Sequence, residues 1–416
     1  MSDRLAEADW LTDSRTAAVM DALEAAGGDD CARFVGGCVR NSLIGRPADD
    51  VDIATTLRPD EVIAALRAAG LKAVPTGVEH GTVTAVSQGR PYEITTLRRD
   101  VETDGRRAVV AFTDDWAEDA HRRDFTLNAL YARRDGAILD PTGRGVADAR
   151  AGRIAFVGDP EARIREDFLR IPRFFRFFAL YGKGEPDAAS LAACEALKAG
   201  IANLAAERVS KELLKLLAAE DPRESVALMA ATGVLAQVLP EAGGLERFDA
   251  LVEIEAGQLF ETEALLRLAA LLTQDPGVAP ALARRLRLSN AERDRLAAAL
   301  EAGPALTGAM SPRDVRRAVY RIGAAVFRDR AKLAWASAAP GDGALSDWRG
   351  LVALAESWPV PLFPLTGADA KAAGAAEGPA VGQALREVEA WWVDEDFPDD
   401  RAAAMARLRN VVGRLN

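Results

Sequence analysis

The segment from residue 34 to residue 56, FVGGCVRNSLIGRPADDVDIATT, constrains the fold of this chain more than any other. Its β-branched and apolar ends predict two short strands, and the glycine pair between them predicts a tight turn into a helix. In a strand, residues two apart point to the same side, roughly 6.6 Å from each other. The second strand therefore brings Asp50 and Asp52 to one face.

Asp50 and Asp52 are the first candidates for chemistry. Two carboxylates that face one cavity suit a pair of divalent cations roughly 3.5 to 4 Å apart, and oxygen ligands suit Mg²⁺. Gly36 and Gly37 let the backbone approach a phosphate and expose N–H groups at the start of the next helix. Arg40 lies on that helix. This order of elements predicts a metal-dependent site for a triphosphate.

The pattern of residue types along the chain changes once, near residue 155. Before this point, short β-rich runs alternate with turn residues and one helical pattern, which predicts an α/β or α+β domain. After it, alanine, leucine and arginine recur with helical periodicity, which predicts a helical array. With 416 residues, 49% of them hydrophobic, the chain is expected to form two or three domains.

Composition argues against several classes of protein. Cys31, Cys38 and Cys194 show no C-x-x-C spacing and the chain has only two histidines, so a disulfide framework or a zinc site is not expected. No stretch reaches the roughly 18 apolar residues of a membrane span, and the polar N-terminus has no signal-peptide pattern. We expect a cytoplasmic protein that does not act at a membrane.

The net charge of −11 argues against a nucleic-acid partner for the chain as a whole, but its arginines gather locally. The three clusters are Arg163, Arg165, Arg170, Arg173 and Arg176; Arg284, Arg285, Arg287, Arg293 and Arg295; and Arg313, Arg316, Arg317 and Arg321. Each cluster alone is as readily a solvated helix face. The two later clusters, in RLRLSNAERDRL and SPRDVRRAVYRIG, are expected to follow an RNA backbone.

The segment HRRDFTLNALY has helical spacing and carries candidates for nucleotide binding. Arg122 and Arg123 supply cations for a triphosphate, and Asp124 supplies an acceptor for a ribose hydroxyl. Asn128, one helical turn later, is expected to help there. The alternative is a surface ion-pair cluster.

The segment REDFLRIPRFFRF predicts selection of the base. On a helix, Asp167 and Arg170 share a face with Arg173, and Arg176 continues the row. An aspartate accepts from an exocyclic amine while an arginine donates to a ring acceptor, an order that cytosine and adenine present and uracil and guanine reverse. The alternative is an ordinary salt bridge. Pro172 is expected to kink the helix between Arg170 and Arg173.

GGCVRNSLIG followed by DDVDIAT resembles the first motif of the class II tRNA nucleotidyltransferases, the CCA-adding enzymes, and of their relatives the bacterial poly(A) polymerases, in the polymerase β superfamily. The resemblance continues, in the family's order, through HRRDFTLNALY, DPTGRGVADARAGRI, REDFLRIPRFFRF and AAERVSKELLKLL. It implies an α+β fold, with a nucleotidyltransferase head containing a small mixed sheet over residues 1–155. A helical neck for base recognition over 156–230 and a helical body and tail for tRNA binding over 231–416 would follow.

The same resemblance implies template-independent addition of CCA to the 3′ end of tRNA from CTP and ATP, by two-metal transfer with Mg²⁺. The tRNA acceptor arm is the implied partner, and DNA is not. The catalytic and metal-binding residues would be Asp50 and Asp52, and the nucleotide-binding residues Gly36, Gly37, Arg40, Arg123, Asp124, Asn128, Asp167, Arg170, Arg173 and Arg176. The alternatives are a poly(A) polymerase, a CC-adding or A-adding enzyme, and a non-catalytic RNA-binding relative.

Further positions bear on these alternatives. Glu93 resembles a family acidic position and is a candidate third carboxylate, while Asn41 stands where the family usually has aspartate. Glu207 and Arg208 resemble a motif that stabilises the start of a helix. The polar stretch around Asp104 is expected to be a mobile loop, and its Asp-Gly-Arg resembles the loop that full CCA-adding enzymes need for the final A. PLTGADAKAAGAAEGPAVGQALREVEAW resembles a tail segment of these enzymes, which favours tRNA.

Overall fold

The computed structural model describes residues 4–5, 8–104, 107–273, 275, 277–301, 303, 305–339 and 344–415. The chain forms two compact units, Met1–Pro240 and Glu241–Asn416. The division at residues 155 and 230 stays a prediction. Within the described ranges, no helix has both the length and the apolar character needed to cross a membrane.

A mixed sheet is the framework of the first unit. Among the described residues it has seven strands in the order β3-β4-β5-β2-β1-β8-β9, with β2 and β5 parallel and the other neighbours antiparallel. The strands are β1 (Ala32–Val35), β2 (Ile53–Thr55), β3 (Lys72–Gly77), β4 (Thr82–Ser87), β5 (Arg90–Thr96), β8 (Tyr131–Ala132) and β9 (Ile138–Leu139). The sheet followed by helices confirms the predicted α+β fold.

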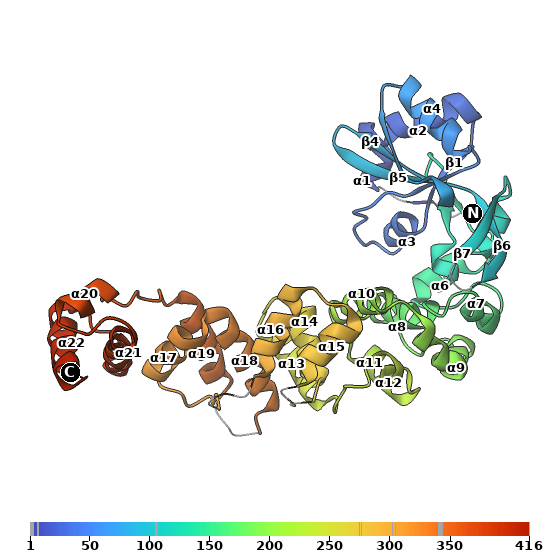
Figure 1. Ribbon diagram of the computed structural model, residues 1–416. Helices are drawn as coiled ribbons and strands as arrows, with labels where there is room; N and C mark the ends of the chain where they lie inside the picture. The colour runs from blue at the N-terminus through green and yellow to red at the C-terminus, as the bar shows by residue number, and fades with distance from the viewer. Residues whose placement is uncertain are drawn as a thin grey trace. The chain divides into compact units, whose positions relative to one another are not determined.

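Helices α2 and α4 lie side by side over this sheet (Figure 1), and α3 packs against β1 and α6. The α-helices of the first unit are α1 (Asp9–Thr12), α2 (Ser14–Gly27), α3 (Gly37–Leu43), α4 (Pro59–Ala68), α5 (Trp116–His121), α6 (Gly145–Ala151), α7 (Pro160–Glu166), α8 (Arg170–Tyr181), α9 (Ala188–Leu197), α10 (Ala206–Leu217), α11 (Arg223–Ala231) and α12 (Val234–Val238). Short 3₁₀ turns occur at η1 (Val78–His80), η2 (Thr126–Asn128) and η3 (Lys198–Asn203).

The polar stretch around Asp104, which was expected to be a mobile loop, forms a hairpin of β6 (Arg98–Asp104) and β7 (Arg107–Phe112). Asp104 ends β6, whereas Gly105 and Arg106 lie outside the described residues. An Asp-Gly pair between β-branched runs is itself a hairpin signal, which the loop prediction overlooked. At the base of the hairpin, a Cβ placed on Gly81 would lie 2.8 Å from Phe112 Cε1, so only glycine fits there.

The second unit is helical in the described residues, as predicted. Its helices are α13 (Glu246–Gly257), α14 (Ala264–Leu271), α15 (Val278–Leu286), α16 (Asn290–Leu300), α17 (Pro312–Ile322), α18 (Ala324–Ser337), α19 (Leu345–Ser357), α20 (Gly367–Ala372), α21 (Pro379–Asp394) and α22 (Arg401–Leu415). Trp335 and Trp348 stack with ring centroids 6.3 Å apart in one core. Val388 and Leu408 belong to a second core between α21 and α22.

Candidate active site

Asp50 and Asp52 lie in the extended segment just before β2, not within the strand as predicted. They nevertheless line the same cavity, about 390 Å³ in volume, together with Glu93 of β5. The parallel pairing of β2 with β5 sets Ile53 opposite Ile94 and so brings Glu93 beside the aspartates. The expectation that the two aspartates face one cavity is confirmed, and a third carboxylate joins them.

The three carboxylates form a cluster of negative charge that Arg123 offsets only in part at Asp52. Burial, followed by the charges of Glu93 and Asp50, raises the pKa of Asp52 to about 6. Among the described residues, none of these carboxylates forms an ion pair or accepts a side-chain hydrogen bond. No three His, Cys, Asp or Glu side chains in the same ranges are arranged to hold a metal ion unaided. The cluster therefore fits a divalent cation that takes its remaining ligands from substrate phosphates and water.

The Gly-Gly turn lies at the start of α3. Gly36 has φ 68° and ψ −119°, a conformation that favours glycine. A Cβ placed on Gly36 would lie 3.9 Å from both Arg123 Nη1 and the carbonyl oxygen of Asn128. The turn therefore approaches the arginine and the asparagine that the sequence assigned to nucleotide binding. A phosphate on its N–H groups stays a prediction.

Arg40 is buried and joins several elements of the first unit. Its Nη2 donates to Tyr181 Oη (2.7 Å) and Asn41 Oδ1 (2.9 Å), and its Nη1 donates to Asn128 Oδ1. The guanidinium also lies 4.0 Å from the centre of the Tyr181 ring. Burial lowers the pKa of Arg40. Asn41 thus satisfies a donor of Arg40 without neutralising its charge, and direct contact of Arg40 with phosphate stays a prediction.

The prediction of a helix over HRRDFTLNALY is wrong. Helix α5 ends at His121, the chain then turns through Arg122 to Asp124, and Phe125 is extended just before η2. Phe125 forms a β-bridge with Phe156, and their rings lie 5.0 Å apart, so burial of the Phe125 ring draws the chain out of the helix. Asn128 still reaches Asp124, because its Nδ2 donates to Asp124 Oδ1 (3.0 Å).

The carboxylate of Asp124 is occupied within the chain. Its Oδ1 accepts from the backbone N of Phe125 (2.8 Å) as well as from Asn128, and its Oδ2 accepts from Nε (3.0 Å) and Nη2 of Arg173. Burial alone would raise the pKa of Asp124, but Arg173 outweighs burial and holds the pKa below its usual value. The ribose-binding role of Asp124 stays a prediction, and it requires an exchange of these partners.

Helix α8 begins at Arg170, so Pro172 is its third residue. The N–H groups of the first helical turn have no partner within the helix, and proline is tolerated there. The expected kink between Arg170 and Arg173 is therefore wrong. Both arginines lie on one continuous helix.

Asp167 does not lie on that helix, which corrects the expected helical face. It ends α7 with φ −154°, and its Oδ2 accepts from Arg208 Nη2 of α10 (2.7 Å). Arg170 Nη1 instead donates to Glu166 Oε2 (2.8 Å). The helical conformation is interrupted between α7 and α8. Asp167 and Arg170 therefore lie in different segments and form separate ion pairs. Their shared reading of a base stays a prediction.

Glu212 of α10 was missed by the sequence analysis. It is 7% exposed, its Oε2 accepts from Arg176 Nε (2.5 Å), and its Oε1 lies 3.6 Å from Arg173 Nη1. The available signal was an acidic residue on the otherwise apolar, buried face of α10. Glu212 holds two of the predicted nucleotide-binding arginines in a row.

Several arginines of the two later clusters form ion pairs with acids of the second unit. Arg316 Nε donates to Asp396 Oδ1 (2.9 Å), and Arg317 Nη2 lies 3.2 Å from Asp394 Oδ1. Arg295 Nε donates to Asp329 Oδ2 (2.7 Å). These arginines hold helices and turns together, and their contact with RNA stays a prediction.

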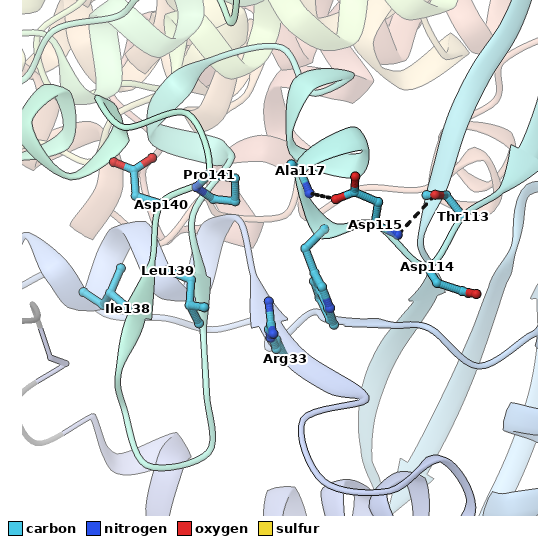
Figure 2. A pocket seen from close by; sticks show the side chains of 10 residues that line it. Arg33, Thr113, Asp114, Asp115, Ala117, Ile138, Leu139, Asp140 and Pro141 are labelled. Carbon is cyan, nitrogen blue, oxygen red and sulfur yellow. Dashed lines mark hydrogen bonds between the residues drawn. The ribbon is translucent and has the colours of Figure 1, made fainter.

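A wider cavity, about 930 Å³ in volume, lies beside α5 (Figure 2). Figure 2 shows the Asp115 carboxylate accepting from the backbone N of Ala117 (2.7 Å), and Thr113 Oγ1 accepting from the backbone N of Asp115 (3.2 Å). Asp140 likewise accepts from the backbone N of Gly143 (3.0 Å). Asp115 and Asp140 cap backbone groups and Asp114 Oδ1 lies 3.5 Å from Arg58 Nη2, so the described residues that line this cavity form no carboxylate cluster comparable to that of Asp50 and Asp52.

The chain is similar to known proteins in both sequence and structure. Residues 32–155 match the family model described as the poly(A) polymerase head domain, and residues 185–244 match a probable RNA- and SrmB-binding site of the polymerase. The chain is 32% identical to the mitochondrial CCA tRNA nucleotidyltransferase 1 of Mus musculus, covering 91% of this chain and 86% of that protein. It is 33% identical to the CCA-adding enzyme of Levilactobacillus brevis, covering 94% and 96%.

The structure is similar to that of the Bacillus stearothermophilus CCA-adding enzyme in complex with CTP, with a TM-score of 0.76, 28% identity and coverage of 97% and 99%. The mixed sheet with its carboxylate cluster is thus that of a nucleotidyltransferase, a class that generally uses divalent metal ions. The chain belongs to the family of CCA-adding tRNA nucleotidyltransferases.

The raised pKa of Asp52 makes metal binding depend on pH. We expect the affinity of the purified chain for Mn²⁺ to fall about tenfold between pH 7.5 and pH 5, because a proton then competes for Asp52, whose pKa is about 6. Electron paramagnetic resonance of free Mn²⁺ measures this affinity. Equal affinity at the two pH values would contradict the assignment.

Asp52→Asn is the matched control, since it keeps the shape of the side chain and removes its charge. In the metal-free chain, a carboxyl whose pKa is raised above the ordinary 3.8 opposes folding once ionised. Stability should therefore decline as pH rises from about 4 to about 6 in the wild type. The variant should lose this decline and bind Mn²⁺ weakly at both pH values.

Proposed function

We propose that this chain adds CCA to the 3′ end of tRNA without a template, using CTP and ATP and releasing diphosphate. The cluster of Asp50, Asp52 and Glu93 beside the Gly36–Gly37 turn carries the proposal, because it combines a cation site with a backbone that approaches phosphate. The printed names of the relatives, a CCA tRNA nucleotidyltransferase and CCA-adding enzymes, agree with it.

In the proposed reaction, the 3′ hydroxyl of tRNA loses its proton to solvent and its oxygen forms a bond to the α-phosphorus, while the bond from this phosphorus to the bridging oxygen breaks. Diphosphate leaves with both electrons of the broken bond. Mg²⁺ held by Asp50 and Asp52 would activate the hydroxyl and offset the charge of the triphosphate. The N–H groups at Gly36 and Gly37 orient the phosphates, and Arg123 supplies positive charge beside them.

In this proposal, residues at the non-helical connection between α7 and α8 select the base. We assign the amine of cytosine or adenine to Asp167, and the ring acceptor to Arg170. Arg208 and Glu166 hold these two side chains in the absence of nucleotide. Arg170 also donates to the carbonyl oxygens of Arg163 (2.9 Å) and Arg122 (3.2 Å), so reading of a base requires Arg170 to share or exchange some of these partners.

A poly(A) polymerase is the second candidate, because the family model that matches residues 32–155 carries that description. Location in the cytoplasm also stays a prediction, and the mouse relative is named as mitochondrial.

Extension of a tRNA that lacks its 3′ CCA separates these candidates. With CTP, ATP and Mg²⁺ together, we expect three added nucleotides ending in A, resolved at single-nucleotide length on a gel. With CTP alone, addition should stop after two. Long A tracts from ATP alone would instead identify a poly(A) polymerase, and no extension under any condition would contradict the proposed reaction.

Asp52→Ala tests the catalytic assignment. We expect incorporation to fall by at least about a thousandfold, since the variant loses a ligand of the cation that stabilises the transition state. Binding of tRNA, measured by filter retention, should change less than about twofold because Asp52 does not contact the acceptor arm in this scheme. Incorporation at the wild-type rate would exclude Asp52 as a metal ligand.

Asp167→Ala tests selection of the base. The ratio of kcat/KM for CTP to that for UTP should fall by about tenfold to a hundredfold, because the variant loses the acceptor that distinguishes an amine from a carbonyl. Arg165→Ala, which removes an exposed ion pair with Glu161 on the neighbouring α7, is the control and should leave the ratio unchanged. An unaltered ratio in Asp167→Ala would refute the assignment.

A further inference from the structure

Asp119, on α5, is a buried acid that no step above uses. Its side chain is 1% exposed. Oδ1 accepts from the backbone N of Arg98 (3.2 Å) and pairs with Arg122 Nη2 (2.7 Å). Oδ2 accepts from Arg123 Nη2 (2.9 Å) and Tyr131 Oη (2.6 Å). We call Asp119, Arg122, Arg123 and Tyr131 the Asp119 cluster.

The Asp119 cluster keeps an excess of positive charge. A buried carboxylate is costly unless it is paired. Burial alone would raise the pKa of Asp119, but Arg123 and Arg122 outweigh burial and hold the pKa below its usual value. Because two arginines share this one acid, one positive charge remains for use outside the cluster.

That charge faces the candidate active site. Asp119 and Tyr131 engage Nε and Nη2 of Arg123, with Nε donating to Tyr131 Oη (3.2 Å). Its Nη1 is at the opposite edge, 3.9 Å from where a Cβ on Gly36 would lie. Within the described ranges, Nη1 has no hydrogen-bond partner of its own. The charge of Arg123 also acts on Asp52, whose pKa it lowers against the opposing effects of burial and the neighbouring acids.

Residues that line the wider cavity pack against the Asp119 cluster. The Asp115 carboxylate caps the start of α5, as Figure 2 shows. Trp116 contacts Tyr131 edge to face, with ring centroids 5.3 Å apart, and the guanidinium of Arg33 lies 3.9 Å from the centre of the Trp116 ring. The phenol that holds Asp119 is therefore itself held by packing.

We propose that Asp119 is a positioning residue for nucleotidyl transfer, whose carboxylate fixes Arg123 so that its Nη1 faces the triphosphate at the Gly36 turn. This inference rests on the proposed function. A guanidinium on a flexible stem loses rotamer entropy when it binds, and one held in place beforehand does not. A purely structural Asp119 would only satisfy Arg122 and the backbone of Arg98, and would not affect phosphate affinity through Arg123.

Binding of inorganic diphosphate to the full chain with Mg²⁺, measured by titration calorimetry, tests the proposal. Asp119→Asn keeps the size of the side chain but cannot accept from both arginines, so the affinity should fall about tenfold. In an Arg123→Ala background, the same change should lower the affinity less than about twofold further, because Asp119 acts through Arg123. Wild-type affinity in Asp119→Asn, or independent losses in the double variant, would overturn the proposal.

Tyr131→Phe is a graded test of the same cluster. It removes the hydrogen bonds that the phenol makes with Asp119 and with Arg123 Nε, but it keeps the carboxylate pair of Asp119 with Arg123, so diphosphate affinity should fall less than in Asp119→Asn and stay within about threefold of the wild type. An equal loss in Tyr131→Phe and Asp119→Asn would show that any damage to the cluster suffices, and would overturn the positioning role.

Asp119→Glu keeps the charge of the buried cluster and moves the carboxylate by one methylene, so it replaces Asp119→Asn if the latter does not fold. We expect at least about fivefold weaker diphosphate binding with the unfolding temperature little changed, and wild-type affinity would overturn the proposal. A wild-type chain that extends tRNA while these variants keep their affinity refutes this inference alone. A wild-type chain that does not extend tRNA refutes the proposed function.

Discussion

Repulsion among Asp50, Asp52 and Glu93 is the constraint on which the rest of the site depends. The parallel pairing of β2 with β5 brings these acids to one cavity. The described residues provide none of them with an ion-pair partner, and burial and mutual repulsion raise the pKa of Asp52 to about 6. Such a cluster costs folding free energy in the absence of a cation. Asp50 and Glu93 are exposed and Asp52 is half-buried, so a divalent ion and a triphosphate can reach the cluster and offset its charge.

The arginines of the candidate site have one feature in common. Each is oriented by a buried polar partner. Asp119 holds Arg123, and Asp124 holds Arg173. Glu212 of α10 contacts the next two arginines of α8, Arg173 and Arg176. Arg40, Asn128 and Asp124 extend this chain of hydrogen bonds from α3, through η2, to α8. A ligand that displaces one partner would therefore affect the neighbouring arginines through this chain of hydrogen bonds.

Local sequence patterns predicted the parts of the site that depend on neighbouring residues. The shared cavity of Asp50 and Asp52, the turn at Gly36 and the helical second unit all follow from such patterns, although the two aspartates precede β2 and do not lie within it. The ends of helices were less predictable, because they depend on distant partners. Phe125 leaves the helical path to pack on Phe156, and the chain breaks after Asp167, whose carboxylate pairs with Arg208.

Two of the acids that orient the arginines, Asp119 and Glu212, were also missed, for a related reason, whereas Asp124 was among the predicted residues. Asp119 lies in an acidic stretch that resembles a solvated surface, and Glu212 lies among charged and leucine residues of an ordinary amphipathic helix. Only the three-dimensional fold shows that each is almost fully enclosed and faces two arginines. The Asp-Gly hairpin of β6 and β7, in contrast, was visible in the sequence and was overlooked.

The most direct measurement of the central claim is a crystal structure of the chain with Mn²⁺ and a CTP analogue that cannot react. We expect anomalous scattering from manganese between Asp50 and Asp52, with the triphosphate along Gly36 and Gly37. Manganese bound away from both aspartates, or a triphosphate on another face of the sheet, would contradict the claim that this cluster is the catalytic centre.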